Sequence, residues 1–273
     1  MRPVSRVARV IPQGGSSQVE KKQLVIGAEG WDRTSPFLFL SEDWFGKPKG
    51  FETHPHRGMQ TVTIVLEGAI EHRDHTGAHG VLSPGDVQWM TAGHGVLHSE
   101  MPHGDETAHT LQLWLNLPAK MKMIPARYQD QRLKDTAVRK LEGGEVRVYA
   151  GRSGEVSHPH ASDYPMALLD IRLKAGARLG QEVSIRDRGF LYVLEGRGRI
   201  GGTEVGKGDV AWFEPGEAEV LAIEATQPLR ALLFSGEPIR EPAVAYGPFV
   251  MNTTQEIQQA FVDYQTGRLV ARR

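Results

Sequence analysis

The sequence contains no cysteine, no long hydrophobic run and almost no net charge. Without cysteine, the 273-residue chain can form neither disulfides nor thiolate metal sites, and it has no cysteine nucleophile. No stretch approaches the roughly 18 apolar residues that a membrane-spanning helix requires. A net charge of −1 and a pI near 6.8 argue against direct binding to nucleic acid or an acidic membrane. We therefore expect a cytoplasmic protein without a membrane anchor.

Helical periodicity is also scarce, which favours an all-β fold. The 31 glycines and 16 prolines separate short runs rich in β-branched and aromatic residues, as in strands joined by turns. One convincing helix is predicted near the end, where Thr253 is a candidate N-cap and Gly267 a candidate stop. The predicted strands are Arg6–Ile11, Pro36–Leu40, Thr61–Leu66, Val87–Met90, Thr110–Leu117, Glu145–Tyr149 and Met166–Leu173.

Two short motifs occur once in each half of the chain. The motif IVLEG at Ile64–Gly68 matches YVLEG at Tyr192–Gly196, and GDVQW at Gly85–Trp89 matches GDVAW at Gly208–Trp212. This weak repeat predicts a duplication of one antiparallel β-domain. We place the domains at residues 1–135 and 136–273, joined by a charged, loop-like linker within residues 118–140.

Four residues in the first half have the spacing of a metal site. His54 and His56 form an H-x-H motif, and His98 and Glu100 form an H-x-E motif. Residues at i and i+2 of a strand point to the same face, so each pair can direct both side chains to one point. Three imidazoles and one carboxylate suit a divalent transition metal such as Fe, Ni, Cu, Mn or Zn. We therefore predict a metal site inside a β-barrel.

The repeat predicts that the second half lacks this site. Superimposing the repeated motifs places Glu182 and Ser184 where the first half has His54 and His56. It likewise places Leu221 and Ile223 where the first half has His98 and Glu100. We therefore expect one metal ion per chain, bound by the N-terminal domain.

The remaining histidines have simpler explanations as surface or structural residues. We expect His72, His75 and His79 to face solvent, because they lie in or beside a polar turn, although one of them could rim a pocket. His94 lies in a Gly-His-Gly turn close enough to contact the metal ligands indirectly. His103 and His109 flank a polar loop and are assigned structural roles, and His158 and His160 are assigned to a surface loop.

Longer strings of the sequence resemble the pirin family of the cupin superfamily. They are HPHRGMQTVTIVLEG, SPGDVQWMTAGHGVLHSEMP, LQLWLNLP and MIPARYQ, which together run through the first half. The resemblance implies two tandem cupin (jelly-roll) barrels, a bicupin, with Fe(II) in the N-terminal barrel. The family's ligands map onto the same four residues, His54, His56, His98 and Glu100. It also implies quercetin 2,3-dioxygenase activity, although some pirins are transcriptional co-regulators or bind other enzymes.

The implied reaction suggests further candidate residues. Glu100 is the candidate base that accepts the proton of a flavonol hydroxyl before dioxygen opens the ring. We also consider Gln60, Gln88, Met90, His94 and Gln112 as pocket or supporting residues. At Gln60 many pirins carry glutamate, and at His94 arginine is frequent. The predicted apolar lining comprises Val62, Ile64, Leu66, Trp89, Met90 and Leu113.

Two functional classes follow from the resemblance. The first is a monomeric flavonol dioxygenase that takes a small aromatic substrate and O2. The second is a metal-dependent regulatory protein that binds a protein partner without catalysis. An oxidase or isomerase acting on another small substrate is a third possibility, because a cupin fold alone does not fix the reaction.

Overall fold

The computed structural model describes residues 1–27, 30–158 and 162–270, which fold into two compact units. Unit 1 contains Met1–Ile11 and Lys134–Pro238, and unit 2 contains Pro12–Leu133 and Ile239–Arg273. The predicted boundary after residue 135 lies two residues from the point, between Leu133 and Lys134, where the chain passes from unit 2 to unit 1. Each end of the chain, however, belongs to the unit formed mainly by the other half. At the N-terminal end, β1 (Arg6–Arg9) pairs with β21 (Asp209–Phe213) of unit 1.

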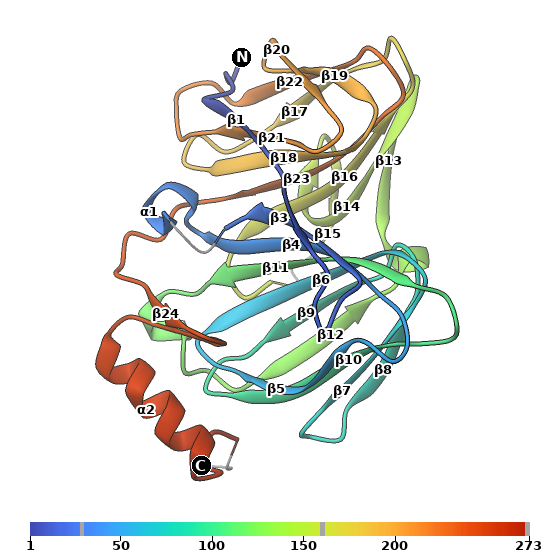
Figure 1. Cartoon of the computed structure of the whole chain (residues 1–273). Coiled ribbons are helices and arrows are strands. Elements are labelled where there is room, and N and C mark those ends of the chain that lie inside the picture. The colour runs from blue at the N-terminus through green and yellow to red at the C-terminus, as the bar shows by residue number, and fades with distance from the viewer. Residues whose placement is uncertain (28–29, 159–161, 271–273) are drawn as a thin grey trace. The chain divides into compact units, whose positions relative to one another are not determined.

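Unit 2 consists of two sheets and a C-terminal extension (Figure 1). The larger sheet has the order β12-β9-β6-β11-β4-β3-β2, and the smaller has the order β5-β10-β7-β8. The strands are β2 (Ile11–Gly14), β3 (Lys21–Ile26), β4 (Phe37–Phe45), β5 (Phe51–His56), β6 (Met59–Glu67), β7 (Ile70–Asp74), β8 (His79–Leu82), β9 (Val87–Thr91), β10 (Val96–Pro102), β11 (Ala108–Asn116) and β12 (Arg127–Gln131). Short helical turns α1 (Trp31–Thr34), η1 (Ala119–Met121) and η2 (Leu133–Asp135) connect them.

Unit 1 repeats this plan with its own two sheets. The larger has the order β1-β21-β18-β23-β16-β14-β13, with β15 paired to β14, and the smaller has the order β17-β22-β19-β20. Besides β1 and β21, the strands are β13 (Ala137–Leu141), β14 (Gly144–Ser153), β15 (Val156–His158), β16 (Met166–Leu173), β17 (Arg178–Glu182), β18 (Arg188–Glu195), β19 (Arg197–Ile200), β20 (Thr203–Gly206), β22 (Val220–Ala225) and β23 (Leu229–Gly236).

The strand orders of the two units match one to one. The order β5-β10-β7-β8 in unit 2 corresponds to β17-β22-β19-β20 in unit 1, and β9-β6-β11-β4 corresponds to β21-β18-β23-β16. Among the described residues, the strands of these sheets pair antiparallel, as expected for two jelly-roll barrels. The predicted all-β fold with two tandem barrels is therefore confirmed.

The predicted linker is largely structured. Residues 118–140 contain η1, β12 and η2, and they lead directly into β13. Strand β12 pairs only along one side in its sheet, where it borders β9. Its first four residues are exposed or half-buried and Gln131 is buried, so a charged sequence is tolerated there as on other edge strands. The loop-like interpretation of this stretch was wrong for that reason.

The C-terminal segment, residues 239–273, adds a hairpin and a helix to unit 2. The hairpin pairs β24 (Val244–Tyr246) with β25 (Phe249–Met251), and α2 (Thr254–Gln265) follows. Thr253 caps α2 as predicted, and Glu256 completes a capping box with it. Figure 1 shows this segment in red beside the blue and green strands of unit 2. No helix in the described ranges is both long and apolar enough to cross a membrane.

The interiors of the two barrels differ in polarity. In unit 1, Leu221 and Ile223 are fully buried within one large apolar cluster. In unit 2, the corresponding strand β10 instead buries His98 and Glu100. Buried polar side chains require partners, so the interior of unit 2 is the candidate location of a functional site.

Candidate metal centre

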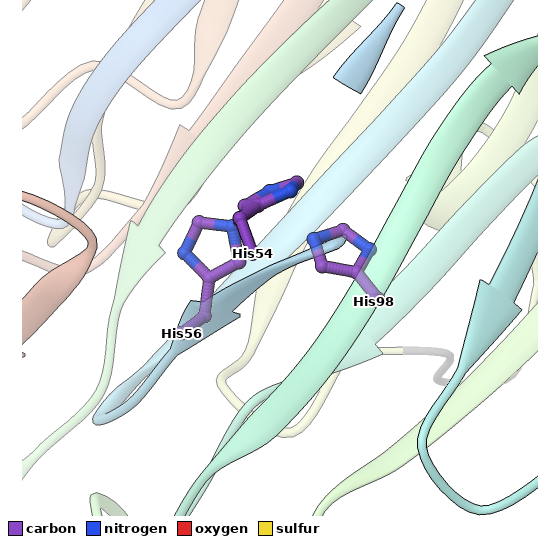
Figure 2. Close-up of side chains that lie close together, drawn as sticks. All are labelled: His54, His56 and His98. Carbon is purple, nitrogen blue, oxygen red and sulfur yellow. The ribbon is translucent and has the colours of Figure 1, made fainter. Parts of the chain in front are cut away.

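Strands β5 and β10 bring His54, His56 and His98 together. The two strands are antiparallel neighbours, with His54 opposite His98 and His56 opposite Val96. Directly opposed residues share one face of a sheet, so the three imidazoles project to the same side. One ring nitrogen from each histidine lies within 4.8 Å of the other two. Figure 2 shows the rings turned toward a common space.

Hydrogen bonds at the Nδ1 atoms fix the orientation of these rings. His54 Nδ1 lies 2.7 Å from the Glu52 carbonyl oxygen, and His56 Nδ1 lies 3.2 Å from the Pro248 carbonyl oxygen. A carbonyl oxygen can only accept, so both Nδ1 atoms must carry the proton and donate it. The Nε2 atoms of His54 and His56 are then lone-pair acceptors, which is the form that binds metals.

The Nε2 positions are unfavourable without a cation and favourable with one. His54 Nε2 and His56 Nε2 lie 3.1 Å apart, yet neither has a proton to share when both Nδ1 atoms donate. His98 Nε2 is buried without a hydrogen-bond partner among the described residues. Three imidazole nitrogens within 4.8 Å of one another are donors that suit a divalent transition metal. The donor set and its spacing therefore fit a divalent transition metal.

Burial keeps all three histidines neutral. It lowers the pKa of His54, and it lowers the pKa of His56 to about 3, with a further contribution from the neighbouring His54. Burial likewise holds the pKa of His98 well below its usual value, helped by the other histidines. Protons therefore compete weakly with a metal at these nitrogens near neutral pH.

Glu100 lies beside the histidines with both carboxylate oxygens occupied. Thr63 Oγ1 donates to Oε1 at 2.9 Å, and Gln112 Nε2 donates to Oε2 at 2.5 Å. Burial raises the pKa of Glu100. Within the described part of the chain, the close group of potential ligands contains the three histidines but not Glu100. Its predicted role as the fourth ligand therefore stays a prediction.

His72 is a buried neighbour of the site, which corrects the expectation that it faces solvent. It is fully buried on β7, opposite Glu100, and its Nε2 lies 3.2 Å from His98 Nδ1. The sequence did carry a signal, because Ile70 and His72 alternate with the polar Glu71 and Arg73. Because His72 follows the apolar Ile70 by two residues on the strand, both side chains lie on the inward face.

The supporting residues predicted from sequence divide into two groups. Gln112 contacts Glu100 directly, and Gln88 faces the same side but donates to Asp130 at 2.9 Å. Gln60 alternates with Thr61 and Thr63, so it lies on the opposite face, where it donates to Thr91. The structure therefore does not bring Gln60 to the histidines.

Met90 and His94 occupy the end of the barrel. Met90 is buried on the same face as Thr61 and packs with Ala92 and Val96. His94 is half-buried, and its main chain accepts a hydrogen bond from Arg57. Both residues therefore lie near the strands that carry the ligands.

Four residues of the predicted apolar lining lie on the face of their sheet that points away from the site. Val62 and Ile64 alternate with Thr63, whose hydroxyl reaches Glu100, so their side chains point away from that carboxylate. Opposed pairs share a face, so Trp89 and Leu113 point away with Val62. Met90 instead pairs with Thr61, which lies on the Glu100 side.

Most of the other described histidines are exposed or structural, as predicted, but His158 ends strand β15 and does not lie in a loop. His75, His79 and His103 are exposed, and His158 is half-buried at the end of β15. His109 is half-buried, bonds Glu42 at 2.7 Å and stacks on Trp44. His160 lies outside the described residues.

Comparisons with known proteins agree with this architecture. Residues 18–115 match the Pirin family, and residues 168–270 match the Pirin C-terminal cupin domain. A pirin-like protein of Solanum lycopersicum is 41% identical, with 96% of this chain and 90% of the relative covered. Human pirin is 36% identical, with 97% and 92% covered. A quercetin 2,3-dioxygenase structure from Acinetobacter baumannii superimposes with a TM-score of 0.90 at 31% identity, covering 99% of both chains.

Proposed function

This chain belongs to the pirin family, and from that premise we propose that it is an iron(II)-dependent dioxygenase of the quercetin 2,3-dioxygenase type. Its substrate would be a flavonol-like aromatic together with O2, and its metal would be held by unit 2 alone. A structure named quercetin 2,3-dioxygenase matches over nearly the full length, which supports this reaction class. Nickel, copper, manganese or zinc could occupy the same donor set.

One observation carries the proposal. The Nδ1 atoms of His54 and His56 are committed to carbonyl oxygens, while their Nε2 atoms lie 3.1 Å apart. This arrangement supports a cation site, and three imidazoles would leave coordination positions for other ligands. We propose His54, His56 and His98 as ligands, with Glu100 as the fourth. Iron bound there would supply Lewis acidity toward a substrate hydroxyl and reactivity toward dioxygen.

The protein's own contribution centres on Glu100. Burial raises the pKa of its carboxyl group, which makes the ionised form a stronger base than an exposed glutamate. Thr63 and Gln112 hold its two oxygens in place, so it can accept the substrate hydroxyl proton at a defined position. A single carboxylate would therefore serve as both metal ligand and proton acceptor.

Aromatic side chains beside the histidines support a planar substrate. The Trp114 ring contacts the His56 ring edge-on at 5.3 Å, and the Phe39 ring lies 5.3 Å from Trp114. Both aromatic residues are only half-buried. Offset or edge-to-face contacts with such rings favour a flat aromatic molecule.

The test combines metal analysis with turnover. Wild-type protein should bind one iron per chain and consume a flavonol with release of carbon monoxide. His56→Ala should lose the metal, and Glu100→Gln should lower turnover by about 10²–10⁴-fold at saturating iron. Wild-type protein with one iron and no turnover on any flavonol would contradict the dioxygenase proposal and support a metal-dependent binding role.

A further inference from the structure

The chain that follows the second barrel returns to the loop that follows His56. The C-terminal segment belongs to unit 2, although it follows unit 1 in sequence. Phe249 of β25 forms a parallel bridge with Arg57, and the Val250 N–H donates to the Arg57 carbonyl oxygen at 3.0 Å. A segment about 190 residues away in sequence therefore lies directly against the residue that follows His56.

This segment supplies the hydrogen-bond acceptor that fixes the His56 ring. The Pro248 carbonyl oxygen lies 3.2 Å from His56 Nδ1. His54, by contrast, uses the carbonyl oxygen of Glu52, which belongs to the same strand. The orientation of His56 Nε2 toward the other histidines thus depends on the position of Pro248, the residue that precedes β25.

A buried ion pair holds the segment in that position. Arg57 donates through Nη1 to Asp263 of α2 at 2.8 Å, and the two side chains are only 5% and 11% exposed. Through Nε, the same guanidinium donates to the His94 carbonyl oxygen. Arg57 thus joins α2 to the loop after β5 and to the turn before β10, the two strands that carry the histidines.

Close packing reinforces these polar contacts. Phe249, Ile257 and Leu269 form an apolar cluster of the C-terminal segment, and Leu97, which precedes His98, packs against it. Gly58 has a φ of +78°, and a Cβ there would overlap the Val250 carbonyl oxygen. The approach between β25 and the loop after His56 is therefore as close as the backbone allows.

We propose that the C-terminal segment is a positioning element of the metal centre. The Pro248 carbonyl oxygen holds His56 with Nε2 toward the metal, and the Arg57–Asp263 ion pair keeps that carbonyl in place. Asp263 is accordingly a positioning residue that never touches the metal. The inference rests on the metal centre of the proposed function, but it is independent of which reaction that centre performs.

Calorimetric titration with Ni(II) tests the proposal on the full chain. Asp263→Ala should weaken Ni(II) binding by about 10–100-fold, the usual effect of removing a group that orients a ligand. Asp263→Asn should recover part of the affinity, because its amide oxygen can still accept from Arg57. This variant keeps the side-chain shape, so it remains informative even where Asp263→Ala leaves the Arg57 charge unpaired and unfolds the protein.

Thr253→Ala is the matched control. It removes the capping box at the start of the same helix without touching Arg57 or the histidines. Thermal stability should fall in this variant while Ni(II) affinity stays at the wild-type value. If the Asp263 variants lose affinity only because the helix is less stable, Thr253→Ala will lose Ni(II) affinity as well. That result would overturn the proposal.

The ring proton of His56 provides a readout that general destabilisation does not move. In the Zn(II)-loaded protein, nitrogen-edited NMR should show a His56 Nδ1–H protected from exchange by Pro248. In Asp263→Asn this signal should shift and exchange faster, while the His54 signal stays unchanged. An unchanged His56 signal together with unchanged Ni(II) affinity would overturn this inference alone. If wild-type protein binds no divalent metal, both this inference and the proposed metal centre are overturned.

Discussion

His72 Nε2 lies 3.2 Å from His98 Nδ1, so two buried histidines form a hydrogen bond with each other. For His98 to present Nε2 to a metal, its Nδ1 must donate, and His72 Nε2 is the acceptor. Burial lowers the pKa of His72, which keeps that acceptor lone pair available. Where His54 and His56 bond main-chain carbonyls, His98 relies on this side chain.

Replacing His72 should therefore weaken metal binding. His72→Phe keeps a ring against Tyr128 but removes the acceptor, and we expect the Ni(II) dissociation constant to rise about 10–100-fold. His72→Gln offers an amide oxygen and should lose less affinity. Titration calorimetry measures both variants, with the exposed His79→Phe as control. Equal affinities for His72→Phe and wild-type protein would show that His98 needs no such partner.

Metal binding should stabilise the fold in proportion to its affinity. At a free Ni(II) concentration of 100 times the dissociation constant, the free energy of unfolding should increase by about 2.7 kcal/mol. Urea unfolding with and without Ni(II) measures this difference, and His56→Ala should abolish it. The control His79→Ala removes an exposed imidazole and should retain it. Stabilisation that persists in His56→Ala would point to a different site.

The second barrel should contribute stability without binding metal. Leu221 occupies a position that corresponds to His98, and it is fully buried in the apolar cluster of unit 1. Leu221→Ala should lower the free energy of unfolding by about 2–5 kcal/mol while the folded protein still binds one metal ion per chain. Urea unfolding and metal analysis by mass spectrometry check the two halves of this prediction. A stoichiometry near two in wild-type protein would refute it.

Lys122 should make stability depend on alkaline pH. Its Nζ is buried and donates to Gly58, Asn116 and Val250, and burial lowers its pKa from 10.5 to about 7. Between those two values the unfolded chain binds more protons than the folded one, so stability rises with pH there. The contribution is at most about 1.4 kcal/mol per pH unit, and it is already complete above pH 10.5.

Lys122→Met should remove that slope. Urea unfolding at pH 7, 8 and 9 gives the dependence for each protein, and Lys120→Met, two residues away and exposed, is the control. The side-chain swap also removes the Nζ donor from buried oxygens, so Lys122→Met should be less stable than wild type at pH 9. Parallel pH profiles for wild type and Lys122→Met would contradict the prediction.

The sequence alone was sufficient for the fold and for the three clustered histidines. Alternation within H-x-H placed His54 and His56 on one face, and the repeated LEG and GDV motifs correspond to matching strands of the two barrels. Thr253 was predicted from its local context as the N-cap of α2, and the structure confirms it. Each of these inferences depends on residues close together in the chain, where geometry follows directly from spacing.

Inferences about the lining failed because strand β6 is buried on both faces. Thr61, Val62, Thr63 and Ile64 are all almost inaccessible, so hydrophobicity does not reveal which side faces the site. The threonines face Glu100, and the more apolar residues face away. Gln60 was misplaced by the same ambiguity, since one step along a strand reverses the face.

The role of the C-terminal segment could not be predicted for a different reason. The contact between His56 and Pro248 spans 192 residues, and neither residue carries a local signal for the other. Asp263 reads as an ordinary polar residue on an amphipathic helix. Only the three-dimensional structure pairs it with Arg57.

The position of Pro248 in the chain has a consequence for biosynthesis. Strands β5 and β10 leave the ribosome well before the carbonyl that orients His56, because about 150 residues separate His98 from Pro248. At roughly 5–20 residues per second, this gap corresponds to about 8–30 seconds of translation. During that interval the nascent first barrel holds its histidines without their full support. Metal loading is therefore expected to follow synthesis of the second barrel, although the ligands are made first.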